Sequence, residues 1–307
     1  MIDSTGETLK FDYIDPSGFS CFNRCPARFL FSRLIGLAPL GDRTISMIAP
    51  DYGTCIHRAI PLAYNDPAAA LEEFKRAWLP LGYEGKDDKR NIRRAEAMLS
   101  NFHRVRKFSC PYEILQFPGI KYASAETISP NEVPFLVDVG ACVPLAGRID
   151  CPARLGESKY IVALDYKTAS EVSARYFECF NMSPQAIAYT LALGQLTGED
   201  VFGFAIEALR VSPVNDEVQM ALIAVPDCVL IEFVDQLCEA ADRIKESIET
   251  NGFERNFAAC SPYGSYGQPG RLCEYAHLCS ALNWRDGLVN YRYITPFDPF
   301  VVEGGAA

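Results

Sequence analysis

The chain has 307 residues, of which 49% are hydrophobic and 22% charged, and its formal net charge is −10 at pH 7. These proportions exclude an intrinsically disordered chain and leave ample apolar material for a core. The acidic balance argues against a broad basic surface for nucleic acid, so any contact with DNA must be made by a local patch.

The compartment follows from what the sequence lacks. It has no run of about 18 apolar residues, and its first residues show no basic start followed by an apolar stretch. We therefore expect a cytoplasmic protein with no membrane partner. Its 12 cysteines are then more typical of metal binding or of a core than of disulfides. The ones expected to be small core residues are Cys55, Cys110, Cys142, Cys151, Cys179, Cys228 and Cys238.

The first third of the chain is predicted to be mainly helical, because its apolar residues recur at helical spacing. The first helix would span 17–36 and carry Cys25. Three further helices are expected at 53–64, 68–78 and 89–107.

After Pro111 the pattern changes to strands, because short runs rich in β-branched residues are separated by proline, glycine and asparagine. Four neighbouring strands are expected at 122–128, 133–139, 142–151 and 160–166. A helix at 182–196, strands at 201–211 and 218–225 around a turn at 213–216, and a long amphipathic helix at 227–249 follow. The residues from about 290 are expected to be loosely tethered, apart from a few aromatic side chains that dock.

The segment around Asp165 and Lys167 carries the pattern of a divalent-metal site. These two residues are two apart on a predicted strand, so their side chains leave the same face, and a hairpin would bring Asp150 alongside. Two carboxylates suit Mg²⁺, and a lysine beside them would orient the nucleophile or stabilise a developing charge on phosphate.

An aspartate and a lysine two apart are also common on exposed strand faces. The apolar run at 160–164 favours the functional interpretation, because it is typical of a buried central strand and charges at the end of such a strand need a reason.

Three further residues fit this chemistry. His57 lies on a predicted helix, and its imidazole could bind the cation with a bias toward Mn²⁺; otherwise it is a packed or surface histidine. Gln185 and Tyr189 are four apart and so share a helix face, where they could support the lysine or contact a phosphate. The alternative is a core tyrosine beside a surface glutamine.

A basic stretch before and within the predicted helix at 89–107 is the candidate DNA-binding patch. Its alternative is an ordinary solvated helix face. Its members are Lys86, Lys89, Arg90, Arg93, Arg94, Arg104, Arg106 and Lys107.

Four cysteines from opposite ends of the chain form a second constellation: Cys25, Cys260, Cys273 and Cys279. The stretch between Cys260 and Cys273 is rich in glycine and proline, which leaves the backbone free to fold around a cofactor. Four thiolates suit a [4Fe–4S] cluster, whereas structural zinc sites usually show two closely spaced ligand pairs. Zinc, free thiols or disulfides are the alternatives, and Cys21, one helical turn before Cys25, could replace it as ligand.

With these residues in view, the chain resembles the RecB-like iron–sulfur branch of the PD-(D/E)XK nuclease superfamily, as found in the AddB nuclease domain, CRISPR-adaptation exonucleases and bacteriophage proteins. The resemblance covers nearly the whole chain. It is carried, in the order typical of the family, by Cys25-Pro26 within 17–29, Gly53 with His57, Gly147 to Asp150, Leu164 to Thr168, Gln185 with Tyr189, and Cys260, Cys273 and Cys279.

The resemblance implies a fold and a set of roles. The fold would be α/β, a restriction-endonuclease-like central mixed sheet flanked by helices, with the terminal segments joined by the iron–sulfur cluster. His57, Asp150 and Asp165 would bind Mg²⁺ or Mn²⁺, and Lys167 would be the catalytic lysine. Gln185 and Tyr189 would support the site, and the preferred cluster ligands would be Cys25, Cys260, Cys273 and Cys279.

The resemblance also implies an activity and an organisation. We expect a metal-dependent deoxyribonuclease, most simply an exonuclease on single-stranded or end-containing DNA, with a possible helicase or recombination partner. The competing functions are a DNA-binding scaffold subunit of such a complex and a zinc-stapled nuclease. A single domain over 1–307 is expected, with a helical part at 1–110, a catalytic core at 111–250, a cluster-binding segment at 251–280 and a tail at 281–307.

Overall fold

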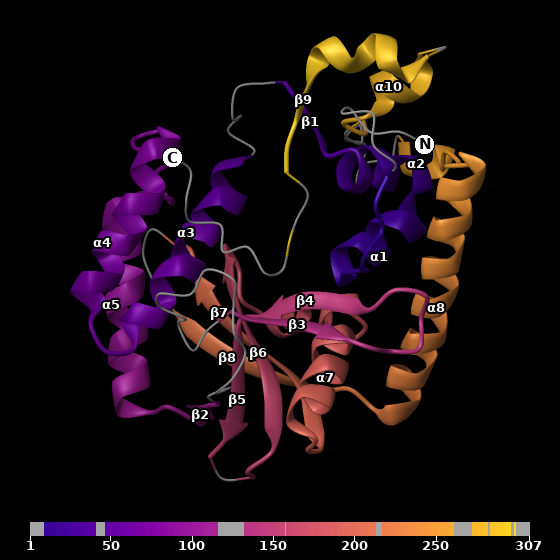
Figure 1. Ribbon diagram of the computed structural model, residues 1–307. Coiled ribbons are helices and arrows are strands. Elements are labelled where there is room, and N and C mark those ends of the chain that lie inside the picture. The colour runs from indigo at the N-terminus through magenta and orange to yellow at the C-terminus, as the bar shows by residue number, and fades with distance from the viewer. Residues whose placement is uncertain are drawn as a thin grey trace. The chain divides into compact units, whose positions relative to one another are not determined.

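Figure 1 shows the computed structural model of the protein. It describes residues 9–40, 47–115, 132–156, 158–212, 217–260, 272–281, 283–295 and 298. The strand expected at 122–128 and the turn at 213–216 lie outside the described residues, as does the stretch between Cys260 and Cys273.

The chain divides into two compact units. The first unit combines Met1–Gly41, Leu136–Gly147 and Leu230–Ala307, and the second unit combines Asp42–Phe135 and Arg148–Val229. All the predicted metal-binding and catalytic residues belong to the second unit, and all the predicted cluster cysteines belong to the first. That one domain includes both units stays a prediction.

The second unit is built on a five-stranded mixed sheet (Figure 1). In spatial order its strands are β2 (Tyr112–Ile114), β5 (Cys151–Leu155), β6 (Ile161–Ala169), β7 (Val201–Arg210) and β8 (Val218–Ala224). Strands β6 and β7 are parallel, and the other neighbouring pairs are antiparallel. The predicted α/β class with a central mixed sheet is confirmed.

Helices cover this sheet. The helices α3 (Ile48–Ala63), α4 (Pro67–Trp78) and α5 (Ile92–Phe108) pack on one another, α3 contacts β6, and α5 contacts β7 and β8. Helix α7 (Pro184–Thr197) contacts β6 and β7. The alternation along β6 separates the two sides: Val162, Leu164 and Tyr166 join the core formed with α3 to α5, whereas Asp165 meets Gln185 of α7.

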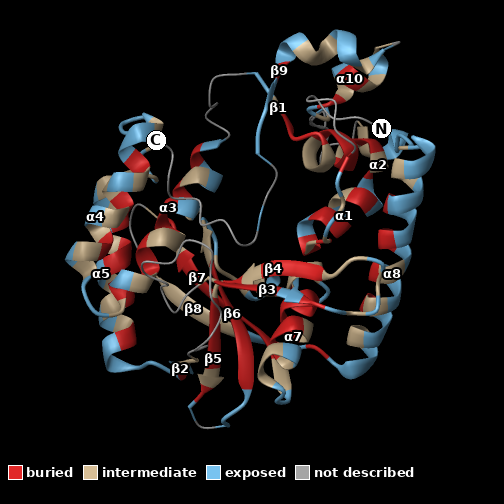
Figure 2. Ribbon diagram, viewed as in Figure 1, coloured by how far each residue is buried: buried red, intermediate tan, exposed pale blue. Residues whose placement is uncertain are grey.

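The middle of the sheet is the most deeply buried part of the second unit, and Figure 2 shows β5 and β6 largely in the colour of buried residues. The first four residues of β6 are at most 1% exposed, as expected for an apolar run in a central strand. Strand β7 approaches β8 closely at Gly203, whose φ is +148° and where a Cβ atom would lie 2.2 Å from the carbonyl oxygen of Ile223. Only glycine fits at this point.

The helix predicted at 17–36 is broken, so that prediction is wrong. The structure has α1 (Pro16–Arg24), then α2 (Pro26–Phe29) and a π-helical turn, η1 (Leu30–Leu34). Cys25 lies between α1 and α2 with extended backbone (φ −164°, ψ 108°). The ring of a proline disfavours helical geometry at the preceding residue, so Pro26 moves Cys25 out of the helix.

The strand predicted at 142–151 is also divided. Its first part is β4 (Leu145–Ile149), which pairs with β3 (Val133–Val137) in a separate two-stranded sheet. Its last residue begins β5, which belongs to the five-stranded sheet. Asp150 is the single residue between β4 and β5, so it lies at a corner and not inside a strand.

Several short elements were not predicted. They are the edge strand β2, α6 (Ala174–Glu178), the 3₁₀ turns η3 (Leu79–Leu81) and η5 (Trp284–Asn290), α9 (Phe257–Cys260), α10 (Ala276–Ser280), and the antiparallel pair of β1 (Leu37–Pro39) with β9 (Tyr291–Tyr293). In β9 the side chain of Tyr291 is buried and donates a hydrogen bond to the Glu274 carbonyl oxygen at 2.6 Å. The long helix predicted at 227–249 is α8 (Asp227–Thr250).

Two expectations about the whole chain can be compared with the described residues. Of the cysteines expected in the core, Cys55 and Cys151 are buried, whereas Cys110, Cys142, Cys179 and Cys228 are exposed, so that expectation was wrong for most of them. Within the described residues, no helix has both the length and the apolar character needed to cross a bilayer.

Candidate active site

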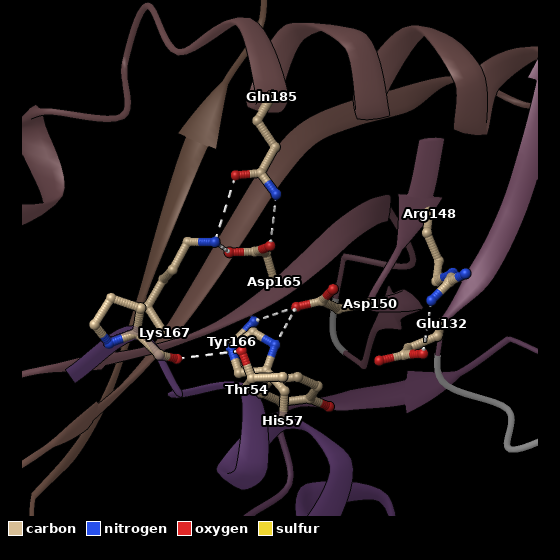
Figure 3. A network of polar contacts seen from close by, with 10 residues as sticks. Thr54, His57, Glu132, Arg148, Asp150, Asp165, Tyr166, Lys167 and Gln185 are labelled. Carbon is tan, nitrogen blue, oxygen red and sulfur yellow. Dashed lines mark hydrogen bonds and ion pairs between the residues drawn. The ribbon is translucent and has the colours of Figure 1, made fainter. Parts of the chain in front are cut away.

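The second half of β6 presents the pair of charges that the sequence singled out. Asp165 is buried, and Lys167 follows it on the same face of the strand. The ammonium nitrogen of Lys167 lies 2.5 Å from Oδ2 of Asp165 (Figure 3). This ion pair occupies the face of the sheet that α7 covers.

Gln185 links these two charges from α7. Its side-chain nitrogen donates to Oδ1 of Asp165 at 2.9 Å, and its side-chain oxygen accepts from Lys167 at 3.4 Å (Figure 3). The helix begins at Pro184, so Gln185 lies in its first turn, where the fixed start of the helix determines the position of the side chain. One amide therefore positions both the carboxylate and the ammonium group.

Asp150 reaches the site from the corner between β4 and β5. Its Oδ2 accepts a hydrogen bond from the backbone N–H of Tyr166 at 3.1 Å and lies 3.3 Å from Nδ1 of His57 (Figure 3). Gly53 lets α3, which carries His57, approach β6, because a Cβ atom at Gly53 would lie 3.0 Å from the hydroxyl of Thr168.

We define Asp150, Asp165, Lys167, His57 and Gln185 as the charged cluster.

The charges in this cluster act strongly on one another. Burial and the negative charge of Asp150 raise the pKa of Asp165, although Lys167 and His57 oppose the rise. Burial acts to raise the pKa of Asp150 too, but His57 and Lys167 outweigh it and hold that pKa below its usual value. Burial lowers the pKa of His57, and the nearby carboxylates, with Asp150 first, more than reverse this. Two carboxylates thus compete for too little positive charge.

Tyr189 is the remaining predicted site residue. It lies one turn after Gln185 on α7 and is buried. Its ring packs against Phe135, with the centroids 5.7 Å apart, and against Phe204 at 6.2 Å. In these contacts Tyr189 anchors the helix that carries Gln185.

Glu132 is a neighbour of the site that the sequence did not indicate. Its backbone N–H donates to the carbonyl oxygen of Asp150 at 2.6 Å, and its carboxylate lies 3.3 Å from the guanidinium group of Arg148 (Figure 3). Glu132 has a φ of +68°, which is uncommon for a residue with a side chain. These contacts hold the corner on which Asp150 lies.

A second set of buried polar side chains, also missed, lies on the opposite face of the sheet. We call it the buried network, and its members are Arg106, Glu207, Tyr112, Tyr64 and Tyr166. Arg106 donates through Nε to Glu207 at 2.5 Å, and the Tyr112 hydroxyl donates to the other oxygen of Glu207 at 2.5 Å. The hydroxyl of Tyr64 then lies 2.5 Å from that of Tyr112 and 2.6 Å from that of Tyr166.

The candidate DNA-binding patch is smaller than predicted. Arg106 is 8% exposed and engaged with Glu207, so including it was wrong. Arg90 pairs with Asp87 at 3.0 Å. The basic residues of the stretch that are exposed are Lys86, Lys89, Arg93, Arg104 and Lys107.

The four predicted cluster cysteines lie in the first unit and come near one another there. The backbone N–H of Asn256 points to Sγ of Cys25 at 3.5 Å, and Sγ of Cys260 points to the carbonyl oxygen of the same asparagine at 3.4 Å. The N–H of Cys273 donates to the Cys260 carbonyl oxygen at 2.9 Å. Burial raises the pKa of Cys279, and the other three thiols raise it further, so all four are within electrostatic range.

Among the residues that the structure describes, no three histidine, cysteine, aspartate or glutamate side chains are grouped as a metal site. In the charged cluster the oxygens of Asp165 face Lys167 and Gln185, and Oδ2 of Asp150 faces His57 and Tyr166.

The donor set nevertheless fits a hard divalent cation, because two carboxylates and an imidazole lie within electrostatic range of one another beside the middle of β6. Oδ2 of Asp165 is buried and faces the ammonium group of Lys167 at 2.5 Å, so a bound cation would share this carboxylate with the lysine.

Comparison with protein families gives one match over most of the chain. The model of the PD-(D/E)XK nuclease superfamily matches residues 14–280. No curated protein matches the chain. Among solved structures, a "Putative exonuclease" from Eubacterium rectale shares 16% identity and a TM-score of 0.48, over 88% of this chain and 94% of that one. SSO0001 shares 13% identity and a TM-score of 0.29, over 66% of this chain and 77% of that one.

Proposed function

Because this chain belongs to the PD-(D/E)XK nuclease superfamily, we propose that its charged cluster hydrolyses phosphodiester bonds of DNA with Mg²⁺ or Mn²⁺. We propose further that it acts as an exonuclease on single-stranded DNA or on DNA ends. The observation that carries the proposal is the ion pair of Asp165 with Lys167 on β6, with Asp150 in electrostatic range of both.

Each side chain of the cluster has a role in this proposal. Asp150, Asp165 and His57 would hold the cation, which when bound makes water more acidic and offsets charge on the phosphate. Lys167 would orient the attacking water or stabilise the negative charge that develops on the phosphoryl oxygens. Gln185 keeps Lys167 and Asp165 in register, and Tyr189 fixes the helix that carries Gln185.

A nuclease assay on end-labelled single-stranded, duplex and circular DNA tests the proposal. We expect cleavage with Mg²⁺ or Mn²⁺, none with EDTA, and none on circular DNA if the action is exonucleolytic. Asp165→Ala should abolish cleavage while the circular dichroism spectrum is unchanged, and Asp88→Ala, at an exposed aspartate, should have no effect. Persistent cleavage by Asp165→Ala would remove the site assignment.

A scaffold subunit of a helicase or recombination complex is the competing function. A binding role alone gives no reason for an ammonium group 2.5 Å from a buried carboxylate with a second carboxylate beside it. We therefore favour an enzyme, for which a helicase or recombination partner would supply single strands. If the protein is a scaffold, wild type and Asp165→Ala should bind DNA with the same affinity, and neither should cleave it.

We also propose that the first unit holds a [4Fe–4S] cluster on Cys25, Cys260, Cys273 and Cys279. Support comes from Cys279, which lies within electrostatic range of Cys25, Cys260 and Cys273. Cys21 is within range of Cys25 but faces the Ser32 hydroxyl at 3.7 Å. Anaerobically purified protein should be coloured and contain iron, and Cys25→Ser should remove the visible absorption. A colourless protein that contains zinc would overturn the cluster, and loss of colour only in Cys21→Ser would change the ligand.

A further inference from the structure

Three aromatic side chains of the second unit lie close together at the surface beside the charged cluster. Tyr176 of α6 packs edge to face with Phe177 and Phe180, with ring centroids 5.4 Å apart in both pairs. All three rings are partly exposed, and the nearby Met182 is 68% exposed. We call Tyr176, Phe177 and Phe180 the aromatic triad.

The chain path places the triad beside the catalytic residues. The segment that contains α6 leaves from the end of β6, which carries Lys167, and returns into the start of α7, which carries Gln185. The contact of 3.4 Å between Lys167 and Gln185 closes the two ends of this segment. Burial raises the pKa of Tyr176, and the charges of Lys167 and Asp165 both act on it, which places this ring within electrostatic range of the charged cluster.

A purely structural role accounts poorly for these rings. Aromatic side chains that serve a core are normally buried, whereas each member of the triad keeps part of its surface in water. A group of partly exposed apolar side chains next to a polar site is typical of a binding surface. The neighbouring Arg175 is exposed and supplies a positive charge on the same short helix.

We propose that the aromatic triad is a stacking platform for the bases of a single DNA strand whose phosphodiester bond lies at Lys167. Every base has an apolar face that can stack on an aromatic ring, so such a platform binds without regard to sequence. In a duplex the base faces are already covered by their neighbours, so the platform selects single strands or frayed ends. This inference rests on the proposed nuclease function and names the strand type that the site accepts.

Binding of fluorescently labelled oligothymidylate in EDTA, which prevents cleavage, tests the proposal. Tyr176→Ala should raise the Kd by roughly 5- to 150-fold, the loss expected for one stacked base. Tyr176→Phe keeps the ring and should bind like wild type. An oligonucleotide of the same length with abasic sites should bind wild type and Tyr176→Ala equally weakly.

Tyr160→Ala is the matched control. Tyr160 is 52% exposed and packs against Phe202 with centroids 5.6 Å apart, so it too is a surface aromatic in a pair. It precedes β6 at the end opposite Lys167, roughly 20 Å away at the rise of a strand. Its loss should leave the Kd unchanged.

The outcomes separate this inference from the nuclease proposal. If wild type cleaves DNA but Tyr176→Ala changes neither the Kd nor the KM, the stacking platform is wrong and the nuclease stands. If wild type binds the oligonucleotide and Tyr176→Ala weakens it but no cleavage occurs with either metal, the platform stands and the nuclease is wrong. Equal binding of intact and abasic oligonucleotides by wild type would also overturn the platform.

Discussion

The charged cluster and the buried network lie on neighbouring strands of one sheet, and they differ in how their charges are balanced. In the buried network one carboxylate, Glu207, meets one guanidinium group, Arg106, and the hydroxyl of Tyr112. In the charged cluster two carboxylates, Asp150 and Asp165, are near a single lysine. Lysine alone cannot balance them, and His57 can do so only when protonated.

This difference separates a structural set of charges from one suited to chemistry. Burial raises the pKa of Glu207, and Arg106 and Tyr112 oppose the rise. The pKa of Asp165 is raised for a second reason, the negative charge of the neighbouring Asp150. A bound divalent cation would offset the repulsion between these two carboxylates, as a protonated His57 does without the cation. Buried charge by itself therefore indicates little, whereas an unbalanced pair of carboxylates indicates a cation site.

Removal of the lysine should have the largest effect of the changes considered. In Lys167→Met nothing opposes the repulsion between Asp150 and Asp165 except His57, and the phosphate loses its positive neighbour. We expect the rate of cleavage to fall by roughly 10²- to 10³-fold, as for the loss of one strong electrostatic contact in a transition state. Single-turnover cleavage of an end-labelled strand measures it.

The control for this variant is Lys245→Met, at an exposed lysine of α8, which should cleave at the rate of wild type. Lys167→Met should also unfold at a lower temperature than wild type, because it leaves the buried carboxylate of Asp165 without its ammonium partner. The rate is therefore normalised to folded protein. A normalised rate equal to that of wild type would assign Lys167 to stability and not to catalysis.

The buried network should respond in the opposite way. Glu207→Gln leaves the guanidinium group of Arg106 buried without its carboxylate, and breaking such a pair costs about 3–5 kcal/mol of unfolding free energy. Cleavage per folded molecule should be unchanged. Urea unfolding measures the first quantity, and the cleavage rate normalised to folded protein measures the second.

Glu73→Gln provides the comparison for Glu207→Gln, because Glu73 also pairs with an arginine, Arg76, but at the surface of α4. Exposed pairs three residues apart contribute only about 0.3–0.5 kcal/mol. If Glu207→Gln and Glu73→Gln lower the free energy of unfolding equally, Glu207 and Arg106 do not form the tightly coupled pair described above.

Added Mg²⁺ or Mn²⁺ should stabilise the protein through the charged cluster and not through the buried network. A cation that binds only the folded protein stabilises it, by about 2.7 kcal/mol at a hundredfold excess over Kd. Melting curves of wild type and of Glu73→Gln should therefore move upward with Mg²⁺ or Mn²⁺, and those of Asp150→Asn should not. An undiminished upward shift in Asp150→Asn would place the cation elsewhere.

The charged cluster was easier to predict than the fold around it. Asp165 and Lys167 could be assigned to one face because the period of a strand is two, and Gln185 and Tyr189 because helix residues four apart share a face. The corner at Asp150 could not be predicted, because the usual signals of a break, Gly147 and Pro152, lie inside β4 and β5 and not between them. Which strand each part pairs with depends on tertiary contacts.

The buried network shows a different limit of the sequence. A single glutamate in the apolar run of β7 indicates that Glu207 needs a partner. That partner, Arg106, is 101 residues away in the chain, and nothing in the sequence distinguishes it from the exposed basic residues around it on α5. Similarly, helical spacing continued across Cys25, and only the following proline indicated the break.

The smallest expected effect tests whether the two sets of charges act independently, since Tyr166 contacts both. Its hydroxyl lies 2.6 Å from that of Tyr64 in the buried network, while its backbone N–H holds Asp150. Tyr64→Phe should cost about 2 kcal/mol of unfolding free energy, because its hydroxyl bonds both Tyr112 and Tyr166 and each typical hydrogen bond contributes about 1 kcal/mol. The kcat should stay within about twofold, less than 0.5 kcal/mol in the barrier, because the backbone contact to Asp150 does not involve the hydroxyl. A tenfold fall in kcat with unchanged stability would show instead that the tyrosine hydroxyls position the metal-binding carboxylate, and that the two sets act as one.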